Sequence, residues 1–94
     1  MNLSEEQLSM VEEMAGLFFS PDYIAVNLQL SEDDSVYFYN SVVLKNTSEP
    51  ASIAYFKGWL ESEISLRRAI KQSAMNGSSP SQQMMINYKR EGII

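Results

Sequence analysis

The segment from Ile53 to Pro80, IAYFKGWLESEISLRRAIKQSAMNGSSP, constrains the fold most, because it has the pattern of one long amphipathic helix. Large apolar residues recur along it at steps of three and four, which places them on one helical face: Ile53, Phe56, Leu60 and Ile64. Asn76-Gly77 offers a left-handed C-terminal cap, and Pro80 lies just beyond it. We therefore predict a long helix whose Leu60 side faces the core.

Two features inside this helix are less ordinary. Gly58 costs a helix about 1 kcal/mol relative to Ala and is expected to mark a close helix crossing. Glu63, Arg67 and Lys71 are spaced four apart and lie near the Leu60 side. The simpler interpretation is a Glu63–Arg67 ion pair bordering the core. The alternative is a surface that meets another subunit or a nucleic-acid phosphate.

The composition limits the chemistry that the chain can perform. Ninety-four residues are enough for one small domain, residues 1–94, with a half at 1–44 and a second half at 50–91. The chain has no Cys and no His, so no disulfide, transition-metal site or common nucleophile–base pair is expected. No Gly-rich phosphate loop is present. We predict a non-enzyme without cofactor or metal.

The same sequence indicates where the protein works. No uncharged apolar segment is long enough to span a membrane, and the N-terminus, MNLSEEQL, is acidic where a secretory signal would be basic. We therefore expect a cytoplasmic protein with no membrane partner.

Charge is distributed unevenly along the chain. Residues 1–44 hold eight acidic residues and no Lys or Arg, whereas residues 45–94 hold seven basic and four acidic residues. The two halves carry −8 and +3, which gives the net charge of −5. Such a dipolar chain could pair head to tail with copies of itself or offer a basic face to nucleic acid.

Helix start signals divide the rest of the chain. Ser4 opens a capping box for a helix at about 4–18, and Ser20-Pro21 begins a short helix to Leu28. Ser31, followed by three acidic residues, opens a helix to Val43, although this aromatic and β-branched segment could also be a strand. Ser79-Pro80 starts a last helix to Arg90 that folds back as a helical hairpin. The predicted fold class is all-α.

The segment FFSPDYIAVNLQLSEDDSVYFYN has the outline of a helix-turn-helix. Four apolar residues would lock its second helix at a fixed angle: Ile24, Ala25, Leu28 and Leu30. With the long helix and the string AMNGSSPSQQMM, this layout resembles the small terminase subunits of tailed bacteriophages. The resemblance implies a phage or prophage protein in the host cytoplasm that binds DNA, forms a homo-oligomer through its hairpin and recruits a large terminase subunit.

The sequence departs from that family in the turn and in the second helix of the predicted helix-turn-helix. Gln29 stands where the turn usually has Gly, and the helix begins Glu32-Asp33-Asp34 with no Lys or Arg before Lys45. Carboxylates at this position repel phosphates. The candidate DNA contacts are therefore five basic residues outside that helix: Lys45, Lys57, Arg67, Arg68 and Lys71. The alternatives are an acidic helical interaction module that never touches DNA and a sequence-specific transcriptional regulator.

Overall fold

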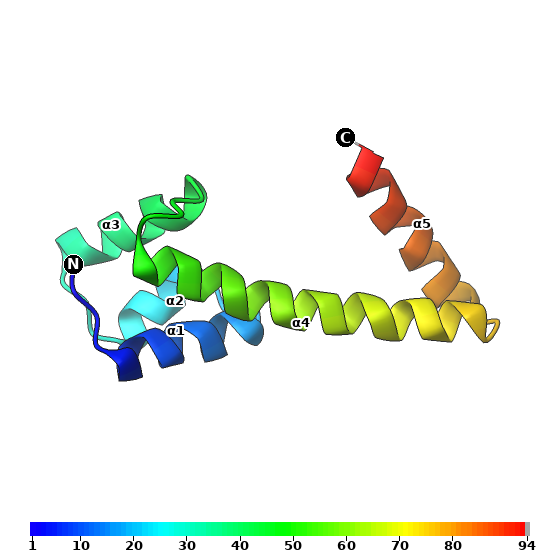
Figure 1. Ribbon diagram of the computed structural model, residues 1–94, viewed down its shortest axis with the longest axis horizontal. Coiled ribbons are helices and arrows are strands. Elements are labelled where there is room, and N and C mark those ends of the chain that lie inside the picture. Colours follow the sequence, from blue (N-terminus) through cyan, green and yellow to red (C-terminus); the bar gives the residue numbers. More distant parts are fainter. Residues whose placement is uncertain (94) are drawn as a thin grey trace. The chain divides into compact units, whose positions relative to one another are not determined.

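The computed structural model describes residues 1–93, and they fold into helices with no strand among them (Figure 1). In chain order the helices are α1 (Glu5–Gly16), α2 (Pro21–Asn27), α3 (Glu32–Val43), α4 (Pro50–Met75) and α5 (Ser79–Ile93). The predicted all-α class is confirmed, and α3 is a helix and not the alternative strand. Helix α5 continues beyond the predicted end at Arg90, and Ile94 lies outside the described residues.

Two of the predicted caps, Ser4 and Ser31, hold helix starts with side-chain hydrogen bonds, whereas Ser20 makes no such bond and Ser79 lies inside α5. The Ser4 hydroxyl accepts the Gln7 backbone N–H at 3.1 Å, and the Gln7 side chain accepts the Ser4 N–H at 2.8 Å. The Ser31 hydroxyl accepts the Asp34 N–H at 3.2 Å, with acidic residues in the first turn of α3 where they suit the helix dipole. These hydrogen bonds therefore fix where α1 and α3 begin.

Four helices end in the same hydrogen-bonded turn. The residue after the C-cap has a positive φ: 65° at Phe18, 55° at Gln29, 53° at Lys45 and 94° at Gly77. After α2, the Gln29 N–H bonds to the Val26 carbonyl and the Leu30 N–H bonds to the Ala25 carbonyl, which is the Schellman pattern. Three of these turns use a side-chain-bearing residue where Gly is favoured. Gln29 therefore keeps the turn geometry at a cost in strain.

Replacing Gln29 by Gly should relieve that strain. The left-handed conformation costs a non-Gly residue about 1–2 kcal/mol. Relief of this strain stabilises the fold, but Gly loses more backbone entropy on folding than Gln does, which offsets part of the stabilisation. We expect Gln29→Gly to raise the free energy of unfolding by about 0.5–1 kcal/mol in urea titrations. As a matched control, Gly77→Ala at the end of α4 should lower it, and a destabilised Gln29→Gly variant would contradict this account.

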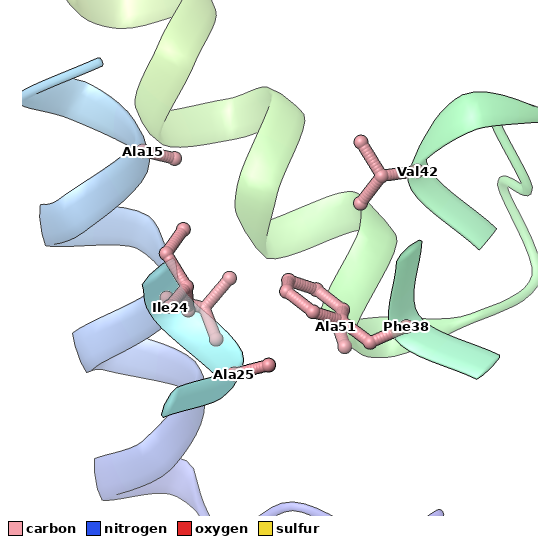
Figure 2. Packing of buried hydrophobic residues seen from close by; sticks show 7 residues of the cluster. Ala15, Ile24, Ala25, Phe38, Val42 and Ala51 are labelled. Carbon is pink, nitrogen blue, oxygen red and sulfur yellow. The ribbon is translucent and has the colours of Figure 1, made fainter. Parts of the chain in front are cut away.

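The described chain divides into two compact units, Met1–Ser62 and Glu63–Ile94, whose boundary falls inside α4. The first unit has a continuous apolar core contributed by its helices (Figure 2). Its fully or nearly fully buried residues are Val11, Ala15, Ile24, Ala25, Phe38, Val42 and Ala51. Phe38 lies at the centre of this cluster and meets the Tyr55 ring edge to face at 6.4 Å between centroids.

Helix α4 begins at Pro50, three residues before the predicted start. Pro at the first helical position follows the same rule as Pro21 in α2, and the segment expected to be a connector therefore ends at Glu49. The Glu49 carboxylate accepts the Ala51 N–H at 3.3 Å, so an acidic side chain holds the new helix start.

Most of the predicted apolar stripe of α4 does not face the core, which corrects the prediction from its periodicity, although its Phe56 packs against the core cluster. Ile53, Leu60 and Ile64 are 46–49% exposed, while Gly58 is buried. A Cβ atom on Gly58 would overlap the Glu12 carbonyl oxygen and lie 2.7 Å from the carbonyl carbon. Because α1 and α4 cross backbone to backbone, the face of α4 toward α1 carries small residues, and Ile53, Leu60 and Ile64 turn outward. The predicted close crossing at Gly58 is confirmed.

The second unit is a helical hairpin formed by the last part of α4 and by α5. The Gln82 side-chain amide donates to the Ala74 carbonyl at 3.1 Å, which joins α5 to the end of α4. Among its described residues, Ile70 is the one buried apolar side chain. This unit therefore has a much smaller core than the first.

Candidate functional site

An apolar groove lies in the first unit, where the end of α3, the loop after it and α4 meet. Its volume is about 800 Å³. Its floor is aromatic and aliphatic, with Tyr55, Phe56 and Trp59 from α4 and Val42 from α3. The Phe18 ring packs edge to face on Trp59 at 6.5 Å, which holds the indole in place. Ile53 and Leu60, which point away from the core, complete the lining of the groove. Part of the predicted apolar stripe of α4 therefore forms a wall of the groove.

The groove has the opposite charge to the unit that carries it. Residues 1–62 contain ten carboxylates and two Lys, a net charge of −8. Both of these Lys, Lys45 and Lys57, line the groove, and none of its lining residues is acidic. The Lys57 ammonium lies 3.5 Å from the Glu12 carboxylate and its side chain is 61% exposed. Because exposed ion pairs are weak, Lys57 can still meet an acidic partner.

The outward face of α2 and α3 is apolar and acidic. Glu32, Val36, Tyr39 and Val43 are spaced four, three and four apart, which places them on one face of α3. Val36 and Val43 are 54% and 57% exposed, and Asp22 from α2 lines a small hollow together with Val36 and Tyr39. Such a face suits contact with a protein better than contact with phosphates.

A polar network fixes the corner between α3 and α4 that shapes the groove. The Tyr37 hydroxyl donates to Glu49 at 2.8 Å, and the Ser52 hydroxyl donates to the Ser41 carbonyl at 3.1 Å. The bond to Glu49 raises the pKa of Tyr37 above its usual value, because it favours the protonated phenol. Glu49 is only 8% exposed, yet both its oxygens have donors, from Tyr37 and from Ala51. The corner is therefore held by satisfied buried polar groups.

Arg67, one of the predicted nucleic-acid contacts, is engaged inside the hairpin. Its Nε donates to Glu63 at 2.8 Å and its Nη2 to Glu91 of α5 at 3.2 Å. Its guanidinium carbon also lies 3.9 Å from the centroid of the Tyr88 ring. The hydrogen bond to Glu63 raises the pKa of Arg67, so its positive charge is secure. The simpler interpretation, a Glu63–Arg67 pair, is confirmed, and this side chain ties α4 to α5.

The other predicted contacts lie in two places. Lys45 and Lys57 line the groove of the first unit, whereas Arg68 and Lys71 are exposed on the hairpin. The hairpin also exposes Lys89 and Arg90, which are not among the predicted contacts although they follow Tyr88 on a predicted helix.

The predicted helix-turn-helix packing residues lie in or against the core of the first unit. Ile24 and Ala25 are buried, while Leu28 and Leu30 are partly buried against the same cluster.

The groove itself was not predicted. Its sequence signal was the density of aromatic residues between Tyr55 and Trp59, on a helix whose Gly58 lies nearly opposite Phe56 and Leu60. No group of three or more carboxylates that could hold a metal ion occurs in residues 1–93.

Comparisons with known protein families, with curated proteins and with solved structures find no match to this chain. Over the described part of the chain, no helix combines the length and apolar character that crossing a membrane requires.

Proposed function

We propose that this chain is a non-catalytic phage or prophage protein of the small terminase type, which assembles with copies of itself and holds DNA. The observation that carries the proposal is the separation of charge between the two units. The second unit contains five Lys and Arg residues and two Glu, a net charge of +3, against −8 in the first. DNA binding rests on neutralising phosphates, so the hairpin is the unit suited to DNA.

Four exposed side chains supply the proposed phosphate contacts: Arg68, Lys71, Lys89 and Arg90. Arg67 is left out because its guanidinium already meets two carboxylates and a tyrosine ring. Helix α3 is also left out as a DNA-reading element, because its first turn is acidic and its outward face carries valines. In this proposal the helix-turn-helix-like segment shapes the first unit and does not contact DNA.

Assembly through the hairpin is supported by its exposed apolar side chains. Ile64, Leu66 and Met75 of α4 are 46%, 40% and 72% exposed, and Met84 and Ile86 of α5 are 41% and 44% exposed. Among its described residues the hairpin buries one apolar side chain and exposes five large ones, so it gains stability when copies cover that surface. A large terminase subunit, met in the host cytoplasm, is the further partner that the resemblance implies.

The test is fluorescence anisotropy of a labelled random-sequence duplex at about 50 and about 200 mM salt. Four phosphate contacts predict an affinity loss of about a hundredfold between these conditions. The Arg68→Glu/Lys71→Glu variant should lose binding at both salts, while Arg68→Lys/Lys71→Arg keeps both charges and should retain it. Loss of binding with Lys45→Glu/Lys57→Glu instead would move the contact to the groove. No binding at the lower salt would refute the DNA part of the proposal.

A second candidate function is an interaction module that never touches DNA. The outward face of α2 and α3 favours it, since a DNA-reading surface would not be acidic and apolar. Under this alternative the titration shows no binding at either salt, and the Arg68→Glu/Lys71→Glu variant weakens docking of the basic half on an acidic partner, because it removes two of the positive charges that the partner meets.

A further inference from the structure

We infer that the apolar groove of the first unit is a docking site for a second copy of this chain, and that the outward face of α2 and α3 of that copy occupies it. This inference rests on the assembly part of the proposed function. It adds a contact between first units to the contact proposed for the hairpins.

The groove has the properties of a protein-docking site. Trp59 and Phe56 lie in its floor, Leu60 is 47% exposed in its wall, and its volume is about 800 Å³. Aromatic residues in a preformed hollow are the usual anchors of an interface. Its two Lys make it the one basic place on a strongly acidic unit, so it selects an occupant that is both apolar and acidic.

The chain itself presents such an occupant. Val36 and Tyr39 are 54% and 45% exposed on α3, with Glu32 one turn before Val36 on the same face and Asp22 beside them from α2. Apolar side chains flanked by carboxylates match an apolar groove flanked by ammonium groups. The acidic first turn of α3 is unfavourable for binding DNA. In the proposed contact its carboxylates meet Lys45 and Lys57 of the other copy.

The contact must join two copies. The groove and the outward face share no lining residue, and both belong to one compact unit with a common core. A copy therefore cannot place its own Val36 in its own groove without unfolding α3 from that core. The two surfaces differ, so the same patch does not meet itself.

The experiment uses the absence of Cys from the full chain. One variant carries Leu60→Cys in the groove and a second, distinguished by a tag, carries Val36→Cys on the outward face. Both side chains are about half exposed, so neither substitution removes a buried group. The variants are treated with a short bismaleimide, separately and mixed, and the covalent products are measured by mass spectrometry. Glu6→Cys, exposed on α1, replaces Val36→Cys in the control mixture.

We expect the mixed sample to give a linked pair of twice the chain mass of 10.7 kDa, in several times the yield of either variant alone or of the control mixture. The yield should fall as salt rises, because charges contribute to the contact. Equal yields in the mixture and the control, or preferential linking of identical variants, would overturn the inference. Selective linking together with failure of the duplex titration would leave the docking site standing and remove only the DNA function.

Discussion

The Gly58→Ala variant is expected to lose at least about 2 kcal/mol of unfolding free energy, although Ala is the better helix former. The added Cβ would overlap the carbonyl oxygen of Glu12 and lie 2.7 Å from its carbonyl carbon. Both atoms belong to the α1 backbone, so no side-chain rotation relieves the clash. A clash with a helix backbone belongs at the upper end of overpacking costs, about 3 kcal/mol or more, and the gain of about 1 kcal/mol in helix propensity offsets only part of it. Urea denaturation followed by circular dichroism measures the change.

Gly16 provides the matched control, because it lies at the same crossing on α1. A Cβ there would lie 3.0 Å from the Ser62 hydroxyl oxygen and 3.3 Å from the Gly58 carbonyl oxygen, so much of the strain can be relieved by rotating Ser62. Gly16→Ala should therefore cost clearly less than Gly58→Ala. Equal effects, or a Gly58→Ala variant as stable as the native chain, would show that α1 and α4 do not approach so closely.

Phe38→Ala should destabilise the first unit by about 3–5 kcal/mol. The ring is fully buried, packs on Tyr55 and lies at the centre of the core cluster (Figure 2). Its removal leaves a cavity that Ile24 and Ala51, on other helices, cannot fill without moving α2 or α4. Thermal unfolding followed by near-ultraviolet circular dichroism reports on the aromatic residues of this unit.

Phe38→Leu is the control for that experiment, since it keeps an apolar side chain in the same place and should cost much less than Ala. Val36→Ala, on the exposed face of the same helix, should change stability by less than about 0.5 kcal/mol. Similar losses for Phe38→Ala and Val36→Ala would contradict the assignment of the core side of α3.

The helices themselves could be predicted from local signals. Ser4 and Ser31 bond to backbone N–H groups at the helix starts, and Gly77 ends α4 as expected. These features depend on a few neighbouring residues, so one sequence is sufficient to find them. The start of α4 lies three residues before the predicted one, because Pro50 occupies the first helical position and does not belong to the connector.

The orientation of α4 could not be predicted in the same way. Periodicity shows that Ile53, Leu60 and Ile64 share a face, but it does not show which face meets the core. Here the close crossing at Gly58, a tertiary contact with α1, determines which face of α4 meets the core. The groove was missed for this reason, since its lining includes Ile53 and Leu60, two large side chains that turn outward.

Because the boundary between the two units falls inside α4, the two ends of this helix differ in how readily they unfold. Helical hydrogen bonds join residues four apart, so each turn depends on its own neighbours and on local packing. The turns before Ser62 rest on a core of seven residues, whereas those after Glu63 rest on Ile70 among the described residues. Segments with little buried apolar surface open at low free energy, and a short isolated helix is marginal in water. One unbroken helix can therefore fray at its C-terminal end while its N-terminal turns stay closed.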